Sequence, residues 1–171
     1  MTAHRGRHLL LALIALGSLC LARADEEKSK PDRGHGDGKH FTFTPDTVKW
    51  GPAPPSLPSG AQLAVLLGSP SKAGMPYVIR VKIPDGYKVA PHWHPVDENV
   101  TVLKGTLMIG PGEKFDEDAA KELPAGSFSH MPKKMRHFAY AKGETIIQVH
   151  GIGPFEIQYV NPEDDPRKKK E

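Results

Sequence analysis

Cysteine is almost absent from the 171-residue sequence, which contains only Cys20. A chain with one cysteine cannot form an internal disulfide, so a packed core must provide its stability. Long apolar runs are also scarce, and the longest, Leu9–Leu21, has 13 residues. A membrane-spanning helix needs about 20, so this run predicts neither a membrane anchor nor a spanning segment.

The N-terminal residues instead predict a secretory signal peptide. Arg5 and Arg7 precede the apolar run, and Ala22-Arg23-Ala24 follows it with small residues at the two positions that a signal peptidase reads. We expect cleavage after Ala24 and a secreted or periplasmic mature protein, free of the membrane.

An excess of charge of either sign is lacking once residues 1–24 are removed. Three arginines leave with that segment, so 20 basic residues face 20 acidic ones. A nucleic-acid-binding protein needs a clustered basic face, and none is visible, so we predict no nucleic-acid partner.

Both ends of the mature chain lack the apolar residues of a folded core. Residues 25–40 contain no large apolar side chain and predict a disordered leader, in which His35 and His40 are solvated rather than metal ligands. Residues 161–171 predict a charged tail. The sequence therefore predicts one domain, residues 41–160.

Helical periodicity is missing from that domain, and short β-rich runs recur at intervals of about ten residues, separated by glycine and proline. In one run Ile79, Val81 and Ile83 share a face. The pattern predicts an all-β sandwich or barrel, with Phe41–Gly60 as an arm over it and residues 116–121 as a turn or short helix. The predicted strands are Phe41–Phe43, Gln62–Leu67, Tyr77–Ile83, Asn99–Leu103, Thr106–Ile109, Ser127–Met131, Arg136–Tyr140, Thr145–His150 and Phe155–Val160.

A candidate metal site begins at His92-Trp93-His94. Two residues apart on a strand, both histidines project from one face and can reach one point, although this spacing also occurs in ordinary strands. Glu98 follows after three residues, and a further histidine must come from a distant strand, for which His137 is the natural candidate. Imidazole and carboxylate ligands suit divalent transition metals.

The spacing around these residues resembles the first motif of the cupin superfamily. Gly86, five residues, His92-x-His94, three residues, Glu98, six residues and Gly105 match every defined position of that motif. The second motif, Pro-x-Gly-x-x-His followed by Asn three residues later, is partly kept in Pro132 to His137, with Lys134 in place of glycine and Tyr140 in place of asparagine.

The resemblance covers about Gln62 to Val160 and implies a cupin, or jelly-roll, β-barrel of two antiparallel sheets with a metal inside its mouth. It implies His92, His94, Glu98 and His137 as the metal ligands. Manganese, iron, nickel, zinc and copper all remain open as the metal.

His130 competes with His137 for the last ligand position. We favour His137 on its spacing, and expect its strand to lie across the barrel from His92 and His94. His130 sits just before Met131-Pro132, where the proline turns the chain. Besides His130, the candidates for further pocket residues are Gln148 and Tyr140. His150 is not expected to be a ligand.

A site with three histidines and one carboxylate leaves one or two coordination positions of a six-coordinate metal free for a substrate or water. The sequence therefore predicts a metalloenzyme acting on a small organic substrate, with dioxygenase-type or carbonyl and lyase chemistry. The alternative is a non-catalytic protein that binds or senses a small ligand. Cupins commonly pair, and unprotected edge strands favour pairing, so we expect a homodimer.

Overall fold

The computed structural model describes residues 40–168 of the chain. The predicted signal peptide, the leader up to residue 39 and the last three residues of the tail lie outside the described residues. Within residues 40–168 no helix is long and apolar enough to cross a membrane. The described elements are nine strands, β1 (Gly51–Pro52), β2 (Gln62–Gly68), β3 (Pro76–Ile83), β4 (Lys88–Trp93), β5 (Glu98–Pro111), β6 (Lys121–Pro124), β7 (Phe128–Met131), β8 (His137–Ile152) and β9 (Gln158–Tyr159), and three 3-10 helices, η1 (Glu117–Ala119), η2 (Pro162–Asp164) and η3 (Pro166–Lys168).

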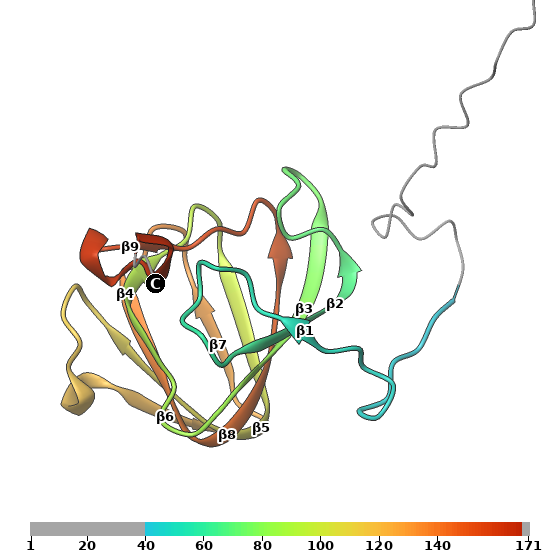
Figure 1. The fold of residues 1–171 in the computed structure, drawn as a ribbon, viewed down its shortest axis with the longest axis horizontal. Coiled ribbons are helices and arrows are strands. Elements are labelled where there is room, and N and C mark those ends of the chain that lie inside the picture. The colour runs from blue at the N-terminus through green and yellow to red at the C-terminus, as the bar shows by residue number, and fades with distance from the viewer. Residues whose placement is uncertain (1–39, 169–171) are drawn as a thin grey trace, which may run out of the picture. The chain divides into compact units, whose positions relative to one another are not determined.

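Every strand pair is antiparallel, and the strands curl around a common interior (Figure 1). One path runs β1-β2-β3-β8-β4-β9, while β5 pairs with β6, β7 and β8. The long strands β5 and β8 bend and serve both sides of the barrel, since β8 pairs with β4 at its start and with β3 at its end. This architecture confirms the predicted all-β jelly-roll fold.

Both long strands replace pairs of predicted strands. The sequence predicted breaks between strands at Lys104-Gly105 and Lys142-Gly143, but the structure has bends within β5 and β8 there. The β5–β8 register shifts on both sides of Lys104. Gly105 has a φ of 74°, and a Cβ on it would lie 2.4 Å from the Glu144 carbonyl oxygen. Glycine is therefore required for the bend to fit.

Other predicted elements differ in smaller ways. Residues 41–43 form no strand, the predicted strand Phe155–Val160 is reduced to β9, and the short strand β6 was not predicted. The stretch before β9 is held instead by a loop contact, in which the Phe155 N–H donates to the Pro70 carbonyl at 2.6 Å. The helix expected within 116–121 is η1, capped by the Asp116 carboxylate.

The buried apolar residues form two clusters, one inside the barrel and one on the outer face of β5 and β8. The larger contains Ile79, Val81 and Ile83, the face predicted from alternation. The smaller, Met108, Phe138 and Tyr140, lies against Phe115 and Ala120. Burial of these side chains provides the stability that disulfides do not.

After β1 pairs with β2, the N-terminal arm runs along one side of the barrel cavity, which it borders with Pro54, Ser56 and Leu57. Figure 1 shows this arm beside β2 and β3. Residues 54–58, which we call the strap, are fixed by two tyrosine hydroxyls. Tyr87 donates to the Pro58 carbonyl at 2.6 Å, and Tyr159 donates to the Ser56 carbonyl at 2.8 Å. The strap therefore forms one wall of the interior.

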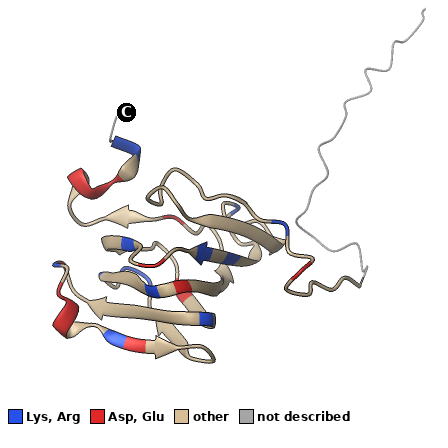
Figure 2. Ribbon diagram, turned by 60° about the horizontal axis from the view of Figure 1, so that its bottom comes forward, with Lys and Arg blue, Asp and Glu red and all other residues tan. Residues whose placement is uncertain are grey.

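Residues 161–168 form η2 and η3 rather than an extended tail. Arg167 pairs with Asp165 at 2.7 Å and donates to the Ile157 carbonyl at 3.2 Å, which fixes this segment to the chain before β9. In the view of Figure 2 acidic and basic residues are interspersed over the strands and 3-10 helices. Exposed ion pairs such as Lys104–Glu144 and Lys142–Glu122 contribute to this mixing.

Candidate metal centre

Strand β4 and the residue after it place the first two histidines. His92 lies in β4, between His137 of β8 and Tyr159 of β9, and His94 follows the strand. Their ring centroids are 5.0 Å apart. The i, i+2 spacing therefore brings both rings to one side of the chain, as the sequence predicted.

His137 is the first residue of β8, and here the predicted position was wrong. We expected its strand to lie across the barrel from His92, but the two residues are direct neighbours on paired strands, with ring centroids 4.3 Å apart. The long β8 bends, so its start reaches β4 while its end pairs with β3. This adjacency brings His137 close to His92 without a span across the interior.

The turn before β8 fixes the position of His137. The Lys134 N–H donates to the His94 carbonyl at 2.8 Å, and the Lys133 N–H donates to the Asp97 carboxylate at 2.8 Å. Lys134 has a φ of 65°, a left-handed conformation that favours glycine. The position where the second cupin motif has glycine is therefore the position where this turn needs positive φ, which supports the register assigned from Pro132 to His137.

Each of the three imidazoles is held by a backbone carbonyl at its Nδ1 atom. The distances are 2.8 Å from His92 to Ala90, 2.7 Å from His94 to Glu156 and 3.1 Å from His137 to Met135. Because a carbonyl oxygen only accepts, each Nδ1 must carry the proton. The lone pairs of the neutral rings are then on Nε2, the arrangement typical of metal-ligating histidines.

These atoms converge with the Glu98 carboxylate. One ring nitrogen from each histidine lies within 4.8 Å of the others, and Glu98 Oε2 is 3.2 Å from the Nε2 atoms of both His94 and His137. All four side chains are buried, with exposed fractions of 2–8%.

The three Nε2 lone pairs and the Glu98 carboxylate face one another, and all of them are acceptors. A cation between them would give each acceptor a partner. His94 Nε2 is fully buried and has no hydrogen-bond partner among the described residues, although Oε2 is only 3.2 Å away. An orphaned nitrogen at the centre of such a cluster fits a metal ion.

The electrostatics of the cluster favour an ionised carboxylate. Burial opposes the charge of Glu98, but the imidazoles of His94 and His137 outweigh it and lower the pKa of the carboxyl group. Burial, with His137 and His94 adding to it, lowers the pKa of His92 to about 3, so this ring stays neutral. For His137 burial acts against protonation, but its contact with Glu98 prevails and raises the pKa.

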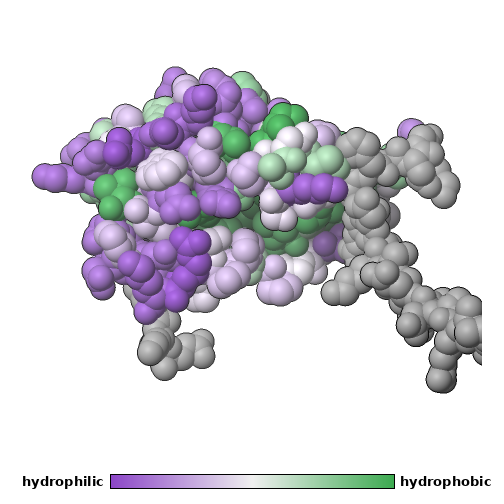
Figure 3. All heavy atoms as spheres, turned by 90° about the horizontal axis from the view of Figure 1, so that it is seen from above, coloured by the Kyte–Doolittle hydropathy of each residue, from purple (hydrophilic) through white to green (hydrophobic). Residues whose placement is uncertain are grey.

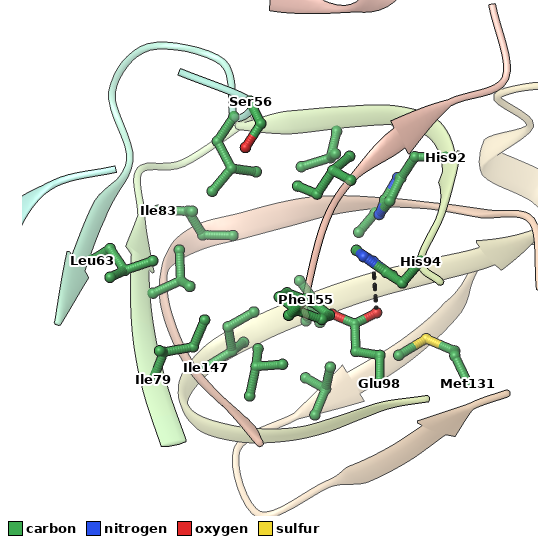
Figure 4. Close-up of a pocket in the computed structure, with 18 of the residues that line it drawn as sticks. Ser56, Leu63, Ile79, Ile83, His92, His94, Glu98, Met131, Ile147 and Phe155 are labelled. Carbon is green, nitrogen blue, oxygen red and sulfur yellow. Dashed lines mark ion pairs between the residues drawn. The ribbon is translucent and has the colours of Figure 1, made fainter. Parts of the chain in front are cut away.

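Phe155 supports the cluster and was not identified from the sequence as a site residue. Its ring stacks on His94, with centroids 4.3 Å apart and planes inclined by 16°, and also contacts Tyr77. The only sequence signal was an aromatic residue in a predicted strand, which does not indicate a partner. Figure 4 shows Phe155 beside His94, with His92 and His94 pointing toward Glu98.

The cluster opens into a cavity of about 150 Å³ inside the barrel. Apart from the four residues of the cluster, its wall contains aliphatic side chains, Phe155, Met131 and residues of the strap. On one face of the molecule, hydrophobic residues are visible in a hollow between hydrophilic ones (Figure 3).

The three predicted pocket candidates do not line this cavity. Ile147 and Val149 face the cavity, so Gln148 points outward, where it accepts a hydrogen bond from Arg80 at 3.2 Å. The alternation of residues along this strand was predicted correctly, but the face that carries Gln148 is the outer face and not the face toward the cavity. His150 shares the outward parity of Gln148.

His130 and Tyr140 are also outside the cavity. His130 is exposed on β7 and hydrogen-bonds through Nδ1 to Asn99 Oδ1 at 2.9 Å. Tyr140 is buried in the small cluster with Met108 and Phe138, because its neighbour Ala139 faces the cavity and alternation directs Tyr140 to the other face of β8. The structure therefore brings together His92, His94, Glu98 and His137, and separates them from His130, Gln148 and Tyr140.

A jelly-roll barrel with this cluster inside it defines the chain as a cupin. By sequence, residues 74–169 match the family described as Domain of unknown function (DUF4437), and the chain belongs to that family. No curated protein matches the chain.

Several solved structures share the fold. The polyketide cyclase RemF from Streptomyces resistomycificus superposes with a TM-score of 0.62 at 15% identity, covering 76% of this chain and 92% of that one. An acetylacetone dioxygenase from Acinetobacter johnsonii gives 0.57 at 14% identity, over 77% and 83%. KdgF from Halomonas sp. gives 0.50 at 19% identity, over 67% and 96%. At these identities the likeness concerns the fold.

Proposed function

We propose that His92, His94, Glu98 and His137 hold one divalent transition metal and that the chain is a metalloenzyme acting on a small organic substrate. The observation that carries the proposal is the convergence of acceptors: three Nε2 lone pairs, fixed by backbone carbonyls at Nδ1, meet one buried carboxylate. Manganese, iron, nickel, zinc and copper all suit such a ligand set.

A metal held by four protein groups keeps open positions, and there it can polarise a carbonyl, activate water or bind dioxygen. The chain's own residues would hold the substrate beside those positions. Phe155 fixes the plane of His94, and the strap limits the access of water. The two enzymes with related folds, a cyclase and a dioxygenase, are in keeping with oxidoreductase or lyase chemistry.

One observation favours the alternative, a protein that binds or senses a ligand without turning it over. Enzymes usually place a general acid or base near the reacting atoms. Besides the proposed ligands, the cavity wall has only Ser56 and Tyr87 as hydroxyl-bearing side chains, and the Tyr87 hydroxyl already donates to Pro58. An enzyme of this design would therefore rely on the metal for its chemistry.

The test is metal analysis of protein purified without chelator, followed by a screen for oxygen uptake and product formation with phenols and 1,3-dicarbonyl compounds. Turnover that disappears with His92→Ala supports an enzyme. Binding of these compounds without turnover supports the alternative, and a chain without stoichiometric metal refutes both.

We further propose that the mature protein is exported and forms a homodimer. Export rests on the predicted cleavage after Ala24, and the mass of the secreted protein tests it: a chain beginning at Asp25 supports it, and one retaining residues 1–24 refutes it. Pairing is supported by exposed large apolar side chains on several strands, among them Val65, Leu103 and Phe128. Light scattering that shows only monomer at micromolar concentration would refute the dimer.

A further inference from the structure

The cavity has a polar end and an apolar end. Its histidine and glutamate side chains, His92, His94, Glu98 and His137, lie together, and Figure 4 shows Leu63, Ile79 and Ile83 on the opposite side. Among residues 40–168, no lysine, arginine, aspartate, asparagine or glutamine lines the cavity. Any ligand therefore meets its charged or polar partners at one end only.

The two remaining polar side chains of the wall belong to the strap or contact it. The Tyr87 hydroxyl is committed to the Pro58 carbonyl, and Ser56 is a single hydroxyl on the strap. A charged or multiply hydroxylated tail at the apolar end would lose its hydration without gaining partners, which costs several kcal/mol for each buried group. Sugars, nucleotides and dicarboxylates are excluded on this ground.

The size of the cavity limits the apolar part of the ligand. A volume of about 150 Å³ is that of a protein cavity that accommodates one benzene-sized molecule. Because this volume includes the polar end of the cavity, the tail that fits here has at most about six carbon atoms. The wall formed by Leu63, Ile147 and Phe155 offers it dispersion contacts only.

We propose that the ligand of this site is a small amphipathic compound, with an oxygen-donor head group that binds the metal and one uncharged aliphatic or aromatic tail of at most about six carbons. Aromatic monocarboxylates, phenols and short 1,3-dicarbonyls belong to this class. The proposal rests on the proposed metal site for the head group and on the cavity wall alone for the tail.

Two hydroxamates that share a head group and differ in the tail separate these parts. On the chain loaded with Zn²⁺, calorimetry should show benzohydroxamate binding at least about thirtyfold more tightly than acetohydroxamate, because about five further carbons are buried. For free Zn²⁺ in solution the two should differ little. The analogue 4-carboxybenzohydroxamate should lose this advantage, because its carboxylate would reach the apolar end.

Two variants that fill the apolar end provide the matched controls. Leu63→Phe, at a half-buried position, and Ile83→Phe should each reduce the preference for benzohydroxamate at least about fivefold and leave acetohydroxamate binding unchanged. A preference below about threefold in the unaltered chain, or equal affinity for the 4-carboxy analogue, overturns the proposal.

If neither hydroxamate binds, the proposed metal site fails, and toluene added to the metal-free chain then decides about the cavity. A rise in melting temperature that is lost in Leu63→Phe supports the apolar cavity, and no rise overturns it.

Discussion

Replacing His137 and His130 in parallel separates the two histidines that the sequence offered for the last ligand position. His137 is 2% exposed, its Nε2 is 3.2 Å from Glu98 Oε2, and its ring lies beside that of His92. His130 is exposed, and its ring makes one hydrogen bond, to Asn99. Only one of the two can contribute to the proposed centre.

The expected magnitudes follow from these surroundings. Loss of a residue that only supports a ligand typically weakens metal binding by about ten- to a hundredfold. His137→Ala removes a direct donor, so we expect at least a weakening of about a hundredfold, or ~2.7 kcal/mol. His130→Ala breaks one exposed contact and should leave the affinity within about twofold, since surface substitutions stay within about 0.5 kcal/mol.

A competition titration against a chromogenic chelator, with Zn²⁺ or Co²⁺, measures both affinities. The melting temperature of each metal-free variant provides the control for folding. If His137→Ala binds like the unaltered chain, or if His130→Ala shows the larger loss, the register assigned from Pro132 to His137 is wrong.

Three further changes test individual contacts. Lys134→Gly relieves the positive φ and should raise the free energy of unfolding by about 0.5–1 kcal/mol in urea titrations, whereas Lys133→Gly should lower it; a shift of the same sign in both would contradict the argument. Burial, with a smaller effect of Tyr159, raises the pKa of Tyr87 above its usual value near 10, so its stabilisation is complete below pH ~10 and is lost as the pH rises further. Tyr87→Phe should therefore lose less stability than the unaltered chain between pH ~10 and ~12, and parallel curves would count against this. Phe155→Leu removes the ring stacked on His94 and should weaken metal binding about threefold to tenfold in the same chelator titration; an unchanged affinity would mean that the ring does not position His94.

The fold could be predicted from the sequence because its signals are local. Alternation in Tyr77–Ile83 and the spacing from Gly86 to Gly105 identified the barrel and the first three residues of the cluster. Gly105 illustrates the physical reason, since the bend that carries the strand past Glu144 leaves no room for a Cβ. Lys134 shows that a motif position can keep its backbone conformation when its residue changes.

The pocket wall could not be predicted, because the information there is not local. Alternation places Gln148 and Ile147 on opposite faces but does not say which face is inside, and both faces of that strand carry apolar residues. A glycine in the sequence can belong either to a turn between strands or to a bend within one strand. Gly105 and Gly143 belong to bends, so the sequence analysis divided β5 and β8 into two strands each. The contact between Phe155 and His94 joins residues 61 positions apart through a loop, which no periodicity predicts.

The most direct test of the proposed metal site is the metal content of the chain, measured by inductively coupled plasma mass spectrometry. X-ray absorption spectroscopy at the edge of the metal found then identifies its ligands. We predict one divalent transition metal per chain, bound by three imidazole nitrogens and one carboxylate, and at least a tenfold lower content in His92→Ala and in His94→Ala. Metal content that is undiminished in both variants, or absorption spectra without imidazole scattering, would contradict the central claim.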